Sequence, residues 1–175
     1  VETWVDSALK SFTSRNFKVV SESGHVYGYG KSVWAMIDLD TRQPVDILAV
    51  RDGLISEYIE TEYPCPIEKS SRVKMSADAA PIRSIDTYYS DVDINGHINS
   101  VKYIEHVLDL WDLSWYKQYC IKRFEIAYVA ESHQGDKLHF YREQRETETD
   151  FNVRITKCNV EGKETEVCRC RVQFV

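Results

Sequence analysis

The sequence predicts an α+β fold in which antiparallel strands outnumber helices, and three observations support this prediction. Most segments are runs rich in Val, Trp, Tyr and Phe, which favour extended strands. Clusters of Ser, Asp, Gly and Pro separate these runs, as turns do. One longer stretch instead places apolar residues at helical spacing: Val101, Ile104, Val107, Leu108 and Trp111.

The first third of the chain is expected to be mainly extended. Turn residues at 21–24 and 40–44 separate three predicted strands, Val1–Leu9, Asn16–Ser21 and Val26–Leu39. Residues 52–62 are expected to form a short helix or an irregular cap. Residues 63–80 contain two prolines and several Ser and Lys residues, so we expect a linker that crosses the surface.

The rest of the chain begins a new pattern at Pro81. A strand is predicted at Ile82–Tyr89, followed by a polar loop and a helix from about Asn99 to Trp111. A second, shorter helix is expected at Leu113–Tyr119. Four further strands complete the pattern: Ile121–Ala130, Asp136–Thr147, Asp150–Cys158 and Glu164–Val175.

Composition and charge narrow the function classes. The net charge of −6 argues against nucleic acid as the main partner, and no apolar run approaches the roughly 18 residues that cross a bilayer. The five cysteines lack paired zinc spacing, so we expect buried thiols in a reducing compartment and no metal or cofactor. An acidic protein partner would need a basic surface; the candidates, in a run that more often forms a solvated face, are Lys69, Arg72, Lys74 and Arg83.

The most informative segment is the polar string at residues 88–99. It places Asp93, Asn95 and His97 just before the predicted helix, for which Asn99 and Ser100 are N-cap candidates. Backbone N–H groups and the dipole at a helix N-terminus stabilise developing negative charge. The string is therefore a place where a carbonyl group can be polarised, although such strings also form ordinary polar turns.

A calcium loop is the rival interpretation of the same string. Asp91, Asp93, Asn95 and Gly96 match the opening of an EF-hand loop. The twelfth position, which needs a bidentate carboxylate, is Lys102. The preceding residues also predict a strand end rather than a helix, so a calcium site is disfavoured.

The longer pattern Tyr-Tyr-x-Asp-x-Asp-x-x-Gly-His-Ile-Asn-x-x-x-Tyr, from Tyr88 to Tyr103, resembles the signature of hotdog-fold thioesterases. It is most similar to the acyl-ACP thioesterase family of plants and bacteria. The resemblance implies a tandem hotdog, with an antiparallel sheet wrapped around a central helix in each repeat. It implies a partial first repeat at 1–62 that lacks its helix in this chain, a linker at 63–80, and a complete repeat at 81–175 that carries the catalytic residues.

The resemblance also implies an activity and a site. The family hydrolyses the thioester of fatty acyl-acyl carrier protein, whose acyl chain is linked to phosphopantetheine, and releases free fatty acid. Its catalytic residues correspond here to Asp93, Asn95, His97 and Glu131. We expect Gly96, Ile98 and Asn99 to contact substrate.

Ser132 departs from the plant pattern, which has Cys at this position. An unactivated Ser is a poor nucleophile, so we expect water to attack with Glu131 as general base. In this scheme Asn95 donates to the thioester carbonyl or positions the water. His97 hydrogen-bonds within the cluster and can protonate the departing sulfur, and Asp93 orients Asn95 or His97.

Two other functions remain open on the sequence. One is an acyl-CoA thioesterase of the 4-hydroxybenzoyl-CoA type, and the other is a non-catalytic module that binds acyl thioesters. A homodimer is possible. The expected location is the bacterial cytoplasm, which Ser132 favours, or the plastid if the source is a plant.

Overall fold

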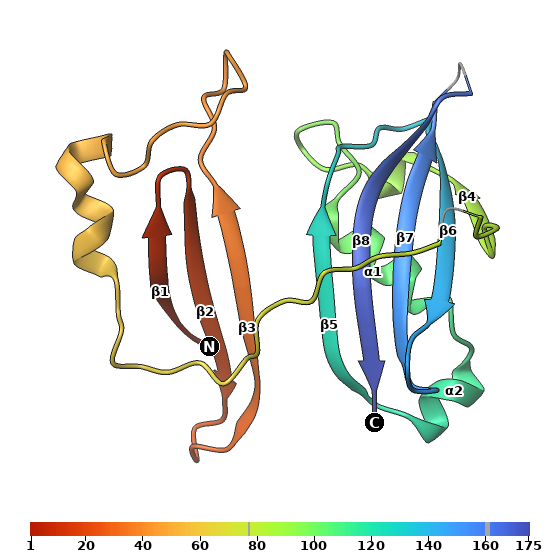
Figure 1. The fold of residues 1–175 in the computed structure, drawn as a ribbon, viewed down its shortest axis with the longest axis horizontal. Coiled ribbons are helices and arrows are strands. Elements are labelled where there is room, and N and C mark those ends of the chain that lie inside the picture. The colour runs from red at the N-terminus through yellow and green to blue at the C-terminus, as the bar shows by residue number, and fades with distance from the viewer. Residues whose placement is uncertain (77, 160–161) are drawn as a thin grey trace. The chain divides into compact units, whose positions relative to one another are not determined.

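A computed structural model of the chain describes residues 1–76, 78–159 and 162–175. The chain divides into two compact units, Val1–Lys69 and Ser70–Val175. Each unit contains its own antiparallel sheet (Figure 1), which agrees with the predicted α+β class. The division falls inside the segment 63–80 that was expected to be a linker. Among the described residues, none of the helices has the length and apolar character needed to span a bilayer.

The first unit is a three-stranded sheet in the order β1-β2-β3. Its strands are β1 (Glu2–Leu9), β2 (Phe12–Val20) and β3 (Val26–Ala35), and a 3-10 helix, η1, covers Val50–Tyr58. Strand β2 begins earlier than expected because Phe12 pairs with both Leu9 and Ala35. Strand β3 ends earlier than expected. The three predicted strands are thus present with shifted ends.

The second unit is a five-stranded sheet with one main helix. Its strands are ordered β4-β6-β7-β8-β5, and every neighbouring pair is antiparallel. The bounds of its elements are β4 Arg83–Asp86, η2 Tyr89–Asp91, α1 Ser100–Leu108, α2 Leu113–Gln118, β5 Ile121–Tyr128, β6 Lys137–Gln144, β7 Asp150–Cys158 and β8 Glu164–Phe174. Strand β4 is shorter than predicted because the chain turns into η2 at Tyr89.

Helix α1 lies against the inner face of this sheet (Figure 1) and forms part of the hydrophobic core. It buries Tyr103 and Val107. The helix ends at Leu108, earlier than predicted, and Trp111 enters the core from the turn that follows, with its ring 5.0 Å from that of Phe174. The predicted apolar stripe is wrong at Val101, which is 52% exposed. Both core cysteines, Cys168 and Cys170, are buried here as free thiols.

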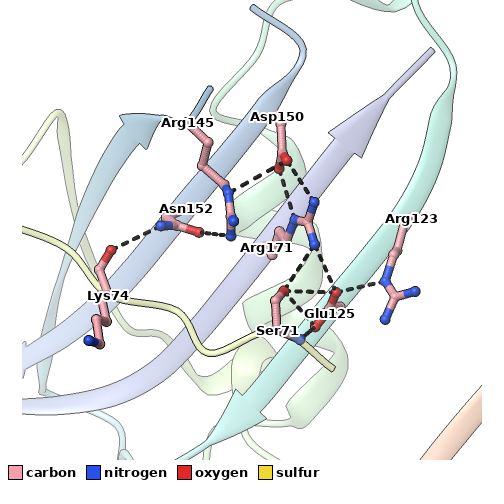
Figure 2. Close-up of polar contacts among 8 residues, drawn as sticks. All are labelled: Ser71, Lys74, Arg123, Glu125, Arg145, Asp150, Asn152 and Arg171. Atoms are coloured by element: carbon pink, nitrogen blue, oxygen red, sulfur yellow. Dashed lines mark hydrogen bonds and ion pairs between the residues drawn. The ribbon is translucent and has the colours of Figure 1, made fainter. Parts of the chain in front are cut away.

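Residues 70–76, which we call the strap, cross the outer face of the same sheet (Figure 1). Polar bonds fasten the strap to the strands (Figure 2). The Ser71 backbone N–H donates to the Glu125 carboxylate at 2.7 Å, and the Asn152 amide donates to the Lys74 carbonyl at 2.9 Å. The outer face is therefore covered by chain, although its side chains are mainly polar or charged.

Candidate active site

The polar string folds into a tight hairpin between Asp93 and His97. The Asp93 N–H donates to the His97 carbonyl at 2.8 Å, and the Gly96 N–H donates to the Asp93 carbonyl at 3.1 Å. Gly96 has a φ of +83°, a left-handed conformation that L side chains rarely adopt. A three-residue loop that ends in left-handed glycine is a common hairpin connection. The local sequence thus explains why the loop closes here.

The Asp93 carboxylate braces this hairpin from within. Its Oδ1 accepts the backbone N–H groups of Asn95 at 2.8 Å and His97 at 3.2 Å. Partial burial raises the pKa of Asp93, but these hydrogen bonds outweigh that effect and leave the pKa below its usual value. The ionised carboxylate therefore holds the backbone of the two residues that were predicted to act on substrate.

Glu131 reaches this hairpin from the segment after β5. The Ile98 N–H donates to the Ser132 carbonyl at 2.8 Å, which ties that segment to the hairpin. As a result, His97 Nε2 lies 3.3 Å from Glu131 Oε2. Both side chains keep contact with solvent, at 30% and 49% exposure. The structure thus brings together an imidazole and a carboxylate that are distant in sequence, on an accessible surface.

Asn95 lies at the exposed tip of the same hairpin. Its side chain also contributes to the lowered pKa of Asp93. The amide therefore lies on the loop that presents His97. Its predicted bond to a thioester carbonyl stays a prediction.

Ser132 points away from this surface. The residue is fully buried, and its hydroxyl has no hydrogen-bond partner among the described residues. The Tyr103 hydroxyl is also buried; burial raises the pKa of this phenol to about 12, and the neighbouring Ser132 offsets part of the effect. The burial of Ser132 argues against its use as a nucleophile.

His133 is a neighbour of the site that was not among the predicted catalytic residues. Its ring centroid lies 5.1 Å from that of His97, with the rings at 77°. The His133 backbone N–H donates to Asp136, and the Thr87 hydroxyl donates to the His133 carbonyl. Its position two residues after Glu131 placed it near the predicted site, where its imidazole could stand in for that of His97.

The three residues expected to contact substrate have local structural roles. Gly96 supplies the left-handed turn, and a Cβ added there would meet no other atom within 4 Å. Ile98 is buried in the hydrophobic core. The Asn99 side chain accepts the Val101 N–H at 3.0 Å and is the N-cap of α1, as predicted. These roles account for the three residues without a substrate, so their contact with one stays a prediction.

Two family models match the chain. Residues 1–58 match the acyl-ACP thioesterase N-terminal domain, and residues 74–174 match the acyl-ACP thioesterase C-terminal domain. The second match alone covers more than half of the 175 residues.

Known proteins give the same result. A crystal structure of an acyl-ACP thioesterase from Bacteroides thetaiotaomicron is 45% identical, with a TM-score of 0.87, over 99% of this chain and 67% of that one. A 12:0-ACP thioesterase from Umbellularia californica shares the fold, with a TM-score of 0.77 at 19% identity, over 99% of this chain and 66% of that one. The chloroplastic palmitoyl-acyl carrier protein thioesterase of Gossypium hirsutum is 26% identical over 91% of this chain. The chain spans 40% of the length of this curated relative.

Proposed function

This chain belongs to the acyl-ACP thioesterase family, and from this membership we propose that it hydrolyses fatty acyl-acyl carrier protein to free fatty acid. Family membership also confirms the predicted hotdog fold class. The observation that carries the proposed activity is the 3.3 Å contact between His97 Nε2 and Glu131 Oε2. It pairs a carboxylate with an imidazole on an accessible surface, as acid–base hydrolysis requires.

The first step is attack of water on the thioester carbonyl carbon. Glu131 accepts a proton from this water as the new C–O bond forms. The carbonyl oxygen gains negative charge, which the Asn95 amide stabilises by donating a hydrogen bond. Asp93 supports this step indirectly, because its carboxylate fixes the loop that presents Asn95.

The second step is loss of the thiolate from the tetrahedral intermediate. The C–S bond breaks, and the sulfur of the phosphopantetheine arm takes a proton from the imidazolium of His97. The proton passed to Glu131 can restore His97, because the two side chains are in contact. The products are the free fatty acid and the carrier with its thiol.

A covalent route through Ser132 has less support. A serine nucleophile needs a neighbouring base to accept its proton and a path to the substrate. The Ser132 hydroxyl is buried and has no hydrogen-bond partner among the residues that the structure describes. Attack by water, with Glu131 as the base, requires neither a change of rotamer nor exposure of this serine.

Hydrolysis of acyl-ACP by Glu131→Gln and Asn95→Ala variants tests the proposal. We expect each to lower kcat by roughly 10²-fold or more, since they remove the general base and the oxyanion donor. Glu105→Gln is a matched control, because it removes an exposed carboxylate of α1 outside this cluster. Near-normal turnover in both folded site variants would contradict the assignment.

The carrier is tested with the same acyl chains attached to acyl carrier protein or to CoA. We expect a higher kcat/KM for the carrier protein at every chain length. Faster hydrolysis of the CoA esters would favour the acyl-CoA thioesterase function. Saturable binding without hydrolysis of either would favour the non-catalytic module.

We further propose a homodimer and a location in the bacterial cytoplasm. The 45% identity with the Bacteroides protein supports a bacterial source. A plastid location would apply to a plant source, where the Gossypium relative is named as chloroplastic. Light scattering on the purified chain tests the dimer; a monomer mass at all concentrations would contradict it.

A further inference from the structure

A cavity of about 310 Å³ lies between the strap and the outer face of the five-stranded sheet. The strap supplies Arg72, Val73, Lys74 and Met75, and strands β7 and β8 supply Arg154, Glu166 and Arg169. The bonds of Ser71 and of the Lys74 carbonyl to the sheet hold the strap at this position (Figure 2). The cavity is therefore built from two segments that are far apart in sequence and fastened together.

The lining has an excess of positive charge. It carries four cationic side chains and one carboxylate, in a chain whose net charge is −6. Arg154 and Arg169 are direct cross-strand partners in β7 and β8. Like charges directly opposite each other destabilise an antiparallel pair. The two guanidinium groups therefore repel each other to the extent that neighbouring anions do not offset their charge.

The partners within the protein compensate only part of this charge. Glu166 forms an ion pair with Arg169, and Glu164 lies close enough to Arg154 for their charges to interact. The Arg154 guanidinium lies 4.4 Å from the centre of the Tyr141 ring, which holds it in place. The Arg154 Nε–H is buried and has no hydrogen-bond partner among the described residues. A guanidinium that the ring contact fixes in place can bind an oxyanion through its terminal N–H groups.

We propose that this cavity binds a small molecule bearing a diphosphate group. A phosphate monoester carries roughly two negative charges at pH 7, and a diphosphate carries more, which matches the excess of cations. Planar guanidinium groups bind phosphate oxygens in pairs, and three of the four cations are arginines. The volume is at the lower end of the range of ligand pockets, about 300 to 1,000 Å³, so the ligand is small.

This site is independent of the proposed hydrolysis. Its residues belong to the strap and to the outer face of β7 and β8, whereas His97 and Glu131 belong to the hairpin and to the segment after β5. Loss of one activity therefore leaves the other measurable. A variant of the cavity is expected to keep its thioesterase activity.

Calorimetric titration of the whole chain with inorganic pyrophosphate, at constant ionic strength, tests the proposal. We expect saturable binding of one pyrophosphate per chain and much weaker binding of sulfate. ADP carries the same group on a nucleoside and is the second probe. Tighter binding of ADP than of pyrophosphate identifies a nucleotide, and equal affinities identify the diphosphate group alone as the ligand.

Two variants with opposite expected effects on pyrophosphate affinity distinguish a change in binding from a folding defect. Arg154→Gln is expected to weaken pyrophosphate at least about tenfold, because it removes a charged donor. Glu166→Gln is expected to tighten binding several-fold, because it removes the one carboxylate of the lining. Lys117→Gln, an exposed lysine of α2, removes one charge elsewhere and should have no effect.

The proposal is overturned by either of two results. One is the absence of saturable binding to the folded chain. The other is equal affinity in the wild type, Arg154→Gln and Glu166→Gln, which would indicate non-specific attraction to surface charge.

Discussion

The two faces of the five-stranded sheet are built from the same strands but stabilised in different ways. On the inner face, buried side chains of β7 and β8 pack in the same hydrophobic core as α1; they are Val153, Ile155, Cys168, Cys170 and Val172. On the outer face, the alternate positions of the same strands carry Asn152, Arg154, Arg169 and Arg171. Alternation along each strand places consecutive residues on opposite faces. One pair of strands thus supports both a hydrophobic core and a charged network.

The difference shows two ways of accommodating buried groups. The inner face buries apolar area, and the resulting hydrophobic stabilisation does not depend on the orientation of the groups. The outer face buries polar groups, each of which needs a partner. Arg171 meets this need by donating to both oxygens of Asp150, at 3.0 and 2.7 Å, and by donating to the Ser71 hydroxyl of the strap (Figure 2). The outer face therefore depends on geometry more than on buried area.

The largest effect on stability is expected from truncation of a side chain on the inner face. Phe140→Ala should lower the free energy of unfolding by about 3–5 kcal/mol, because it leaves a cavity at a fully buried position. Urea denaturation measures this. Tyr141→Phe, on the next residue, is the matched control and should cost less, about 1.5–3 kcal/mol, because it removes only a hydrogen bond to the Glu164 carboxylate. Equal costs for the two variants would contradict the comparison of the faces.

A smaller loss is expected on the outer face from Arg171→Ala. Among the described residues, it leaves the buried Asp150 carboxylate with the more distant cation of Arg145, at 3.5 Å. We expect a loss of about 1–3 kcal/mol, below that for a fully buried pair because Arg171 is partly exposed. A double-mutant cycle with Asp150→Ala measures the coupling energy. A coupling near zero would mean that the pair does not stabilise the face.

Low pH is expected to reduce the stabilisation that Glu164 contributes on the outer face. Hydrogen bonds from Thr156 and Tyr141 are the main reason that the pKa of Glu164 lies below its ordinary value of 4.5. A depressed pKa contributes stability that is present above the unfolded value and is lost as the pH falls through the folded value. The advantage of the wild type over Glu164→Gln should therefore shrink below about pH 4.5. A difference that grows with acid, in unfolding measured from pH 6 to pH 3, would contradict this.

The smallest effect is expected at a buried polar group that has no partner. Ser132→Ala removes a hydroxyl that is buried without a hydrogen bond among the described residues. We expect a change of at most about 1 kcal/mol, since the interaction with the neighbouring Tyr103 hydroxyl is weak and a desolvated group is removed. Turnover of acyl-ACP should also be retained. Complete loss of turnover in the folded variant would revive a covalent mechanism.

Much of the second unit could be predicted because its signals are local. The helical spacing at Ile104 and Val107, the cap at Asn99 and the alternation in β7 and β8 depend on residues close in sequence. The predictions were wrong where contacts between residues far apart in the sequence decide the structure. Strand β2 begins at Phe12 because two other strands pair with it, and Val101 is exposed although its spacing suits the core.

The candidate site also combines features set by local contacts with features set by contacts between distant segments. The sequence by itself determined the hairpin of Asp93 to His97, because Gly96 and the Asp93 carboxylate act within a few residues. Only the tertiary structure decided that His97 meets Glu131 and that the Ser132 hydroxyl faces inward. It also decided that the strap and the outer strands enclose a basic cavity. These contacts join distant segments, so the register of the strands and the path of the strap set them, and no local pattern encodes either.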